Sequence, residues 1–262
     1  MKTVAFSSIK GGTGKSSLCI LLANYATAAG SRVLVIDLDI QNSTTFYYFA
    51  GSADLSASDP TDRKNVALAM QTGDLPGNII SVPVNSHDLS LLPSSFSLVN
   101  LRAIAERTLK RLLAADLPFD YCFIDCPPTF DNIVLNAVNA AQLIITPAAF
   151  STFDYKGALF YRDQIERDTT NVDAWRLLFN FYRPARTHNP DALRNQYEAA
   201  FRSAFGDTII PASVPETTLI RRYIDTRQHL TRTTQKPQGV TVFEAITELA
   251  AYVGISSSPE RF

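Results

Sequence analysis

The amino-acid sequence predicts an α/β fold with a mostly parallel, doubly wound sheet flanked by helices. Short apolar runs typical of buried strands alternate with helical patterns, as in successive βαβ units. The first run leads into a glycine-rich loop and a helical pattern, and two later runs end in aspartates. The sequence contains no internal repeat, low-complexity block or linker, so its 262 residues are predicted to form one domain, 1–262.

The elements are predicted from local patterns in chain order. Apolar or β-rich runs predict strands at residues 3–9, 32–39, 88–95, 121–125, 141–149, 175–182 and 208–215. Helical length and spacing predict helices at residues 15–29, 98–115 and 240–254, and Gly30 should end the first of them. Residues 51–64 are polar and rich in turn formers, so we expect a surface loop there.

The composition argues against several classes of protein. The chain is 46% hydrophobic and 19% charged with a net charge of −1, so no overall positive field indicates nucleic-acid binding. Three cysteines (Cys19, Cys122 and Cys126) are too few for a disulfide framework and suit a reducing cytosol. No apolar run approaches the roughly 20 residues that span a bilayer, and the first residues lack a signal-peptide pattern. We therefore expect a cytoplasmic protein.

The stretch SSIKGGTGKSS, residues 7–17, has the spacing of a phosphate-binding loop. Its glycines let backbone N–H groups surround phosphate oxygens, and the following helix adds the positive end of its dipole. Lys15 is spaced to reach the β- and γ-phosphates, and the Ser16 hydroxyl to bind Mg²⁺. The candidate nucleotide-binding residues of the loop are Gly11, Gly12, Thr13, Gly14, Lys15, Ser16 and Ser17.

Three aspartates are predicted to lie at the same edge of the sheet as this loop. Asp37 and Asp39 end the strand in VIDLDIQNS, and Asp125 ends the strand in YCFIDCPP. In open α/β sheets the ligand binds at the carboxyl ends of the strands. Mg²⁺ keeps several waters and takes few protein ligands, so some of these carboxylates should act through water.

Five stretches together resemble the ParA/MinD family of deviant Walker-A ATPases. They are KGGTGKSS, VIDLDIQNS, DLSLLPSS, FDYCFIDCPPTFDNIVLNAVNAAQLIITP and IIPASVPETT, in matching order and spacing over nearly the whole chain. The resemblance implies a P-loop NTPase fold of the deviant Walker-A type, with ATP and Mg²⁺ as cofactors. Ile40 replaces the family's proline, which would loosen the turn after Asp39, and Ser16 replaces the usual threonine but keeps the hydroxyl.

The resemblance also suggests a role for the second lysine of the loop, Lys10. In this family the early lysine acts across a dimer, where it reaches the phosphates bound by the other subunit. A cation there would stabilise charge on the phosphoryl group in the transition state, as an arginine finger does in other P-loop enzymes. Hydrolysis would then depend on dimerisation, so Lys10, Lys15 and Asp39 form the expected catalytic set.

Further roles are implied by the same resemblance. Asp39 would orient or activate the attacking water, and Asp37 would support the metal shell. Asp125 would hold a metal-bound water, and with Ser16 these two aspartates form the expected metal site. Asn180 and Pro211 stand where this family contacts adenine.

Three functions within the wider family remain open at this point. They are a ParA-type ATPase that binds DNA as an ATP dimer, a MinD-type ATPase that binds membrane, and a P-loop enzyme that couples ATP to small-molecule chemistry. The last stretch, ELAAYVGISSSPERF, does not have the pattern of a basic amphipathic helix that could anchor the protein to a membrane. This disfavours the MinD-type function. Cys122 and Cys126 have no metal-ligand spacing and read as core residues, which disfavours the iron–sulfur branch of the superfamily.

The distribution of charge favours the DNA-binding reading. Between Arg176 and Lys236 there are ten Lys or Arg residues and five acidic ones, and nine of the ten cations are arginines. Arginine suits phosphate contacts, and by resemblance this segment contains the DNA-facing surface. The candidate DNA-binding residues are Arg183, Arg186, Arg221 and Arg222.

These observations predict a ParA-like ATPase that positions or segregates DNA or another cargo. It should form a homodimer with ATP, bind DNA without sequence preference and hydrolyse ATP slowly. A ParB-like or adaptor protein should stimulate hydrolysis. We expect the protein to be cytoplasmic and associated with the nucleoid, without stable membrane insertion.

Overall fold

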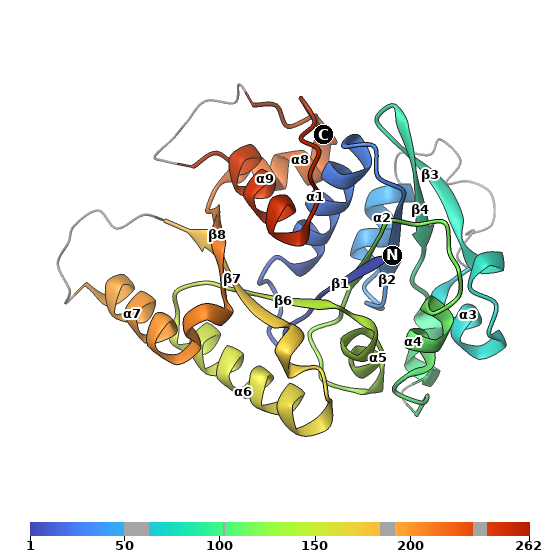
Figure 1. The fold of residues 1–262 in the computed structure, drawn as a ribbon, viewed down its shortest axis with the longest axis horizontal. Helices are drawn as coiled ribbons and strands as arrows, with labels where there is room; N and C mark the ends of the chain where they lie inside the picture. Colours follow the sequence, from blue (N-terminus) through green and yellow to red (C-terminus); the bar gives the residue numbers. More distant parts are fainter. Residues whose placement is uncertain (50–62, 102, 184–191, 233–239) are drawn as a thin grey trace.

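The computed structural model describes residues 1–49, 63–101, 103–183, 192–232 and 240–262. These residues form an eight-stranded sheet in the order β3-β4-β2-β5-β1-β6-β7-β8 (Figure 1). Every neighbouring pair is parallel except β3 and β4. The strands are β1 (Lys2–Phe6), β2 (Val33–Asp37), β3 (Ile80–Val84), β4 (His87–Leu92), β5 (Tyr121–Asp125), β6 (Leu143–Ala148), β7 (Trp175–Tyr182) and β8 (Ile209–Pro215). The predicted fold class is confirmed.

Helices cover both faces of the sheet (Figure 1). One hydrophobic core lies under α1, α2, α8 and α9, and a second lies under α3 to α7. The α-helices are α1 (Lys15–Ala28), α2 (Ser43–Phe49), α3 (Val66–Thr72), α4 (Thr108–Leu113), α5 (Asn132–Ala140), α6 (Thr152–Asp168), α7 (Leu193–Phe205), α8 (Thr218–Thr226) and α9 (Val242–Val253). Short 3₁₀ turns are η2 (Pro76–Asn78), η3 (Phe96–Leu101), η4 (Val172–Ala174) and η5 (Gly206–Thr208).

The central strands supply both cores from alternate residues. In β1, Val4 and Phe6 belong to the core under α1, whereas Ala5 belongs to the core under α5 and α6. Successive side chains of a strand point to opposite faces, so a strand covered on both sides is apolar at every position. This explains why the central strands read as continuous apolar runs in the sequence.

Glycines flank helix α1 on both sides, as the sequence predicts. Gly14 precedes it with φ 92°, and Gly30 follows shortly after its end with φ 86°. Both angles lie in the left-handed region that favours glycine. Every residue of α1 from Leu18 to Thr27 is buried, because the helix lies between the sheet and α9. The predicted closing helix is also confirmed as α9, which begins with a capping box of Thr241 and Glu244.

The prediction of one helix at residues 98–115 is wrong. The described part of this segment holds the end of η3, a turn and the short helix α4. The side chain of Asn136 in α5 is buried and accepts a hydrogen bond from Leu109 N while donating one to Ala105 O. Asn132 and Asn139 of the same helix donate to the carbonyls of Ile104 and Glu106. These side-chain amides form hydrogen bonds with backbone groups that would be paired within the helix if it were continuous.

One strand and several helices of the fold were not predicted from the sequence. The predicted strand at residues 88–95 is β4, but β3, which pairs with it as an antiparallel hairpin, was not predicted. Helices α2, α3 and α5 to α8 were also not assigned from the sequence. Most of the predicted loop at residues 51–64 lies outside the described residues.

Candidate phosphate-binding site

The glycine-rich loop connects β1 to α1 at the carboxyl edge of the sheet. Gly12 has φ 72° and Gly14 has φ 92°. A Cβ atom at Gly11 or Gly12 would meet no heavy atom within 4 Å, so the loop leaves space on its outer side. A Cβ at Gly14 would lie 2.3 Å from Asn180 Nδ2, so only glycine fits there. No side chain caps the N-terminus of α1, which leaves its first N–H groups available to an anion.

Lys15 is held inside this loop. Its side chain is buried, and Nζ donates a hydrogen bond of 3.1 Å to the carbonyl oxygen of Lys10. Burial lowers the pKa of Lys15, whereas the charges of Asp125 and Asp39 oppose that shift. The ammonium group is therefore positioned over the loop by the loop's own backbone, as a cation for bound phosphate requires.

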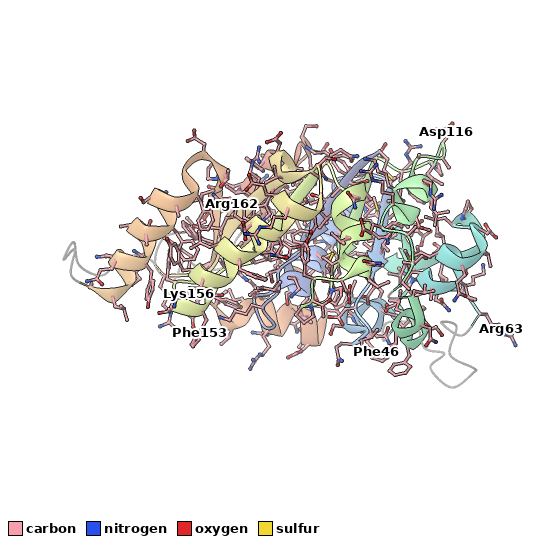
Figure 2. The ribbon with its side chains drawn as sticks, turned by 90° about the horizontal axis from the view of Figure 1, so that it is seen from below. Phe46, Arg63, Asp116, Phe153, Lys156 and Arg162 are labelled. Carbon is pink, nitrogen blue, oxygen red and sulfur yellow. The ribbon has the colours of Figure 1, made fainter. Side chains whose placement is uncertain are left out.

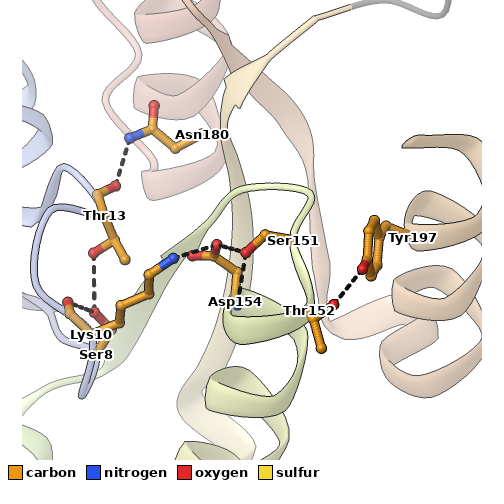
Figure 3. A network of polar contacts seen from close by, with 8 residues as sticks. All are labelled: Ser8, Lys10, Thr13, Ser151, Thr152, Asp154, Asn180 and Tyr197. Carbon is orange, nitrogen blue, oxygen red and sulfur yellow. Dashed lines mark hydrogen bonds and ion pairs between the residues drawn. The ribbon is translucent and has the colours of Figure 1, made fainter. Parts of the chain in front are cut away.

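Polar side chains hold the loop in place through hydrogen bonds (Figure 3). The hydroxyls of Ser8 and Thr13 lie 3.1 Å apart and share a hydrogen bond. Asn180, at the carboxyl end of β7, donates from Nδ2 to the carbonyl oxygen of Thr13 at 2.7 Å. Its other amide atom, Oδ1, is buried and has no hydrogen-bond partner among the described residues. Asn180 therefore lies against the loop.

Asp37 and Asp125 lie side by side because β2 and β5 pair in register at these residues. Thr45 donates to Asp37 Oδ2 from both its backbone N–H and its hydroxyl, at 2.8 and 2.7 Å. The Thr44 hydroxyl donates to Asp125 Oδ2 at 2.7 Å. Burial raises the pKa of both carboxyls, and the charge of Asp125 raises the pKa of Asp37 further. Two adjacent buried carboxyls favour a bound cation.

Asp39 lies in the turn between β2 and α2. Its Oδ1 accepts a hydrogen bond from Gln41 N at 3.0 Å, and its carbonyl oxygen accepts one from the Ser94 hydroxyl at 2.8 Å. Asp39 N in turn donates to Asp37 Oδ1 at 3.0 Å. The predicted group of three aspartates therefore does gather beside the phosphate-binding loop.

The donor set fits a magnesium ion that keeps most of its water. Asp125 Oδ1 is buried and has no hydrogen-bond partner among the described residues. The Ser16 hydroxyl lies near enough to Asp125 to lower the pKa of that carboxyl. Within the described ranges, no three His, Cys, Asp or Glu residues are grouped closely enough to cage a metal. Mg²⁺ suits such a site because it dehydrates reluctantly.

Lys10 is paired within its own chain (Figure 3). Its Nζ lies 2.6 Å from Asp154 Oδ2, while 40% of the lysine side chain remains exposed. Asp154 is buried in the first turn of α6, and Ser151, the N-cap of that helix, donates to the same carboxylate. Asp154 was not predicted, and no motif in the sequence pointed to it.

The second predicted adenine contact, Pro211, lies away from the loop. It is the third residue of β8 and lines a hollow with Phe179, Tyr182 and Tyr252 at the outer edge of the sheet. Pro215, at the carboxyl end of β8, instead lines the cavity that reaches the phosphate-binding loop. A strand-end criterion would have favoured Pro215, because ligands bind at the carboxyl ends of parallel strands.

The four predicted DNA-binding arginines have different environments. Arg183 forms an ion pair with Glu216. Arg186 lies outside the described residues. Arg221 and Arg222 are both exposed on α8, but only Arg221 lines the cavity beside the loop.

Comparison with known proteins places this geometry in a family. Residues 1–172, more than half of the chain, match the family described as AAA domain (AAA_31). The chromosome partitioning protein ParA of Caulobacter vibrioides is 25% identical over 224 residues, which cover 82% of this chain and 80% of the relative. The chain belongs to the ParA/MinD family of P-loop ATPases. The resemblance inferred from the five sequence stretches is thus confirmed.

Two further similarities agree with this family assignment. The maintenance of carboxysome distribution protein A of Synechococcus elongatus is 30% identical over 156 residues, which cover 58% of this chain and 60% of the relative. The crystal structure of a putative plasmid partition protein from Borrelia burgdorferi, bound to AMPPNP, superposes with a TM-score of 0.74. That structure is 21% identical and covers 97% of this chain and 98% of its own, so it supports the ParA/MinD fold.

Proposed function

We propose that this ParA/MinD-family chain is a partition or positioning ATPase that dimerises around ATP and binds DNA without sequence preference. The observation that carries the proposal is the buried Lys15, held over an uncapped helix N-terminus and beside the adjacent carboxyls of Asp37 and Asp125. Relatives named for chromosome partitioning and for carboxysome distribution support the positioning role. The cargo would be DNA or another large assembly.

The loop is proposed to hold the triphosphate of ATP. Gly11 and Gly12 leave open space on the side where phosphate oxygens would lie, and Lys15 supplies the cation. The Ser16 hydroxyl would bind Mg²⁺, and Asp125 would accept a hydrogen bond from a metal-bound water. The ion would neutralise charge on the β- and γ-phosphates. Asn180 Oδ1, which has no hydrogen-bond partner in the part of the chain that the structure describes, would accept from the amino group of adenine.

Asp39 is proposed to orient the water that attacks the γ-phosphate. Asp39 is only 8% exposed, and its backbone is fixed by hydrogen bonds to the Asp37 carboxylate and the Ser94 hydroxyl. Asp37 would hold this turn and the metal shell in place through Thr45. A fixed acceptor near the γ-phosphate aligns water for in-line attack, which is the main demand that phosphoryl transfer makes on the protein.

Lys10 is proposed to complete the site of a second subunit. To do so its ammonium group must leave Asp154, since the two are paired in the single chain. The phosphates of the partner subunit's ATP would take the place of the Asp154 carboxylate, so Lys10 would still be paired with an anion after the exchange. Hydrolysis would then require dimerisation.

Exposed aromatic residues support a dimer contact at this edge. Phe46 of α2 is 59% exposed, and Phe153 of α6 is 79% exposed. Both follow the carboxyl ends of strands, β2 and β6, and Figure 2 shows both toward the lower edge of its view. Exposed aromatics at a functional edge are typical of protein interfaces.

DNA is proposed to bind the basic segment, with Arg222 as the main described candidate. Arg222 is exposed and has no ion-pair partner among the described residues. Arg183 is a weaker candidate because Glu216 neutralises it. A ParB-like or adaptor protein is proposed to stimulate hydrolysis, and the protein is proposed to be cytoplasmic and associated with the nucleoid.

The membrane alternative has less support in the fold. The apolar side chains of α9, including Phe243, Ile246 and Leu249, are buried against the core under α1. An interfacial helix needs a free apolar face, and α9 offers none. Within the described ranges, no helix combines the length and apolar character needed to cross a membrane.

Nucleotide titration tests the proposed site. Lys15→Ala should reduce ATP affinity below the measurable range, because the phosphates lose their buried cation. The matched control is Lys156→Ala, which removes an exposed lysine of α6 and should bind ATP as the wild type does. Near-normal affinity of Lys15→Ala for a fluorescent ATP analogue would remove the basis of the proposal.

A further inference from the structure

A cavity of about 710 Å³ opens from the phosphate-binding loop toward α8. Gly12, Gly14 and Ser17 line it at the loop. The ends of β7 and β8 and one side of α8 supply the rest of its lining. Its volume lies within the range of roughly 300–1,000 Å³ that small-molecule sites occupy. The cavity is thus large enough for the part of a nucleotide that extends beyond the phosphates.

Phe181 is held in this cavity by an unfavourable backbone conformation. Its φ is 55°, in the left-handed region that a bulky side chain rarely adopts, and 40% of the residue is exposed. A Cβ at Gly14 would lie 3.7 Å from Phe181 Cζ, so the ring lies next to the phosphate-binding loop. An aromatic ring that is both strained and exposed beside a ligand site indicates a binding role.

Arg221 supplies a cation to the same cavity. It is exposed on α8, lines the cavity and has no hydrogen-bond or ion-pair partner among the described residues. Arg183 lines the cavity too, but Glu216 pairs with it. Arg222, the next residue along the chain, does not line the cavity. Of the two adjacent arginines, only Arg221 is therefore placed to meet a ligand there.

Helix α8 is fixed to the rest of the fold at the residue after this pair. The hydroxyl of Tyr223 accepts a hydrogen bond of 2.7 Å from Asn24 Nδ2 in α1. The same amide nitrogen donates to the Tyr47 hydroxyl at 2.9 Å, and Tyr48 donates to Asn24 Oδ1 at 3.0 Å. The cavity wall that carries Arg221 is thus anchored to α1 and α2 rather than free to swing away.

We propose that Phe181 and Arg221 bind the nucleoside end of the nucleotide. The Phe181 ring stacks on the base, and the Arg221 guanidinium contacts the nucleotide from α8. This inference rests on the proposed ATP function and assigns Arg221 to the nucleotide site instead of the DNA surface. The two adjacent arginines then serve different ligands: Arg221 the nucleotide, and Arg222 the DNA.

The role of Phe181 is tested by titrating ATP and inorganic tripolyphosphate separately by calorimetry. Phe181→Asn removes the ring but suits the left-handed backbone, because asparagine adopts it readily. It should weaken ATP binding about tenfold, as expected for a lost base–aromatic stack, and leave tripolyphosphate binding unchanged. Phe181→Tyr should restore ATP affinity.

Two results would overturn the role of Phe181. One is wild-type ATP affinity in Phe181→Asn. The other is an equal loss of ATP and tripolyphosphate binding, which would mean that the substitution damages the loop. If the wild-type protein bound neither ligand, the proposed function itself would fail, and that result differs from both.

The assignment of the arginines is tested by comparing Arg221→Ala with Arg222→Ala. Arg221→Ala should weaken ATP binding about tenfold, as expected for the loss of a charge-assisted contact. Arg222→Ala should instead weaken DNA binding, measured at saturating ATP. Wild-type ATP affinity in Arg221→Ala, or an equal loss of ATP affinity in both variants, would contradict the assignment.

Discussion

Lys10 and Lys15 belong to one loop but have different surroundings. Lys15 is buried and hydrogen-bonded to the loop backbone, whereas Lys10 is partly exposed and paired with Asp154. A cation that stays with bound phosphate should be fixed, and a cation that acts on a second subunit should be able to leave. The two environments match these two roles.

The first prediction at the residue scale concerns Lys10→Ala. This variant should bind ATP with near wild-type affinity, because the loop backbone and Lys15 remain. Its hydrolysis should fall by about 10³-fold, the lower range for loss of a cation supplied across an interface. A coupled-enzyme assay of phosphate release measures the rate, with Lys156→Ala as the control. A variant that hydrolyses ATP at the wild-type rate would refute a role in trans.

The residues of the site that could be predicted are those that belong to a short, recognisable sequence pattern. The spacing of KGGTGKSS fixes the loop, and the aspartates end recognisable strands, so their convergence followed from the rule for strand ends. Asp154 lies 144 residues from Lys10, and Phe181 acquires its position from its backbone angle. Neither feature leaves a local pattern. Pro211 was named from the family resemblance alone, and the strand-end rule, which favours Pro215, was not applied to β8.

At the scale of elements, the segment 98–115 shows how side chains override periodicity. Its apolar spacing predicts a helix, yet the asparagines of α5 bind its backbone and divide it. Hydrophobic periodicity records which face is buried and not whether backbone groups have competing partners. Strongly apolar central strands were easier to predict, because few alternatives suit a run that is buried on both faces.

The element-scale prediction is a stability measurement on Asn136→Ala. Asn136 is fully buried and bonds Leu109 N, Ala105 O and Asn132 O. Its loss would leave buried backbone groups unpaired, and the free energy of unfolding should fall by about 2–3 kcal/mol. Urea unfolding followed by circular dichroism measures the change. Asn132→Ala removes the hydrogen bond of 3.2 Å from a half-buried side chain to Ile104 O, and it should lower the free energy of unfolding by less. Equal stability of Asn136→Ala and wild type would mean that the contacts are dispensable.

At the scale of the whole molecule, the sequence predicted the class of sheet but not the order of its strands. The antiparallel β3 at one edge pairs with β4 through a hairpin, whose short strands carry little signal. The distribution of charge is also a property of the whole chain. Ten basic residues against five acidic ones between Arg176 and Lys236 give a near-neutral protein one basic region. Dimerisation would bring two such regions together.

The lifetime of the dimer provides a prediction at this scale. Asp39→Ala should bind ATP and dimerise but hydrolyse ATP poorly, because the attacking water loses its acceptor. The ATP dimer should therefore outlast that of the wild type severalfold after excess nucleotide is removed. Static light scattering over time measures the mass. A variant that returns to monomer as quickly as the wild type would exclude Asp39 from orienting the water.

DNA binding under two nucleotides tests the central claim most directly. An electrophoretic shift on unrelated DNA fragments is measured with ATP and with ADP across a salt series. An ATP dimer that joins two basic regions should bind every fragment, and log K should fall by about 0.9 per phosphate contact for each decade of salt. Binding with ADP should be nearly absent, and Arg222→Glu should abolish the shift but not dimerisation. Absence of salt-sensitive binding with either nucleotide, especially together with ATP-dependent sedimentation on lipid vesicles, would contradict the account.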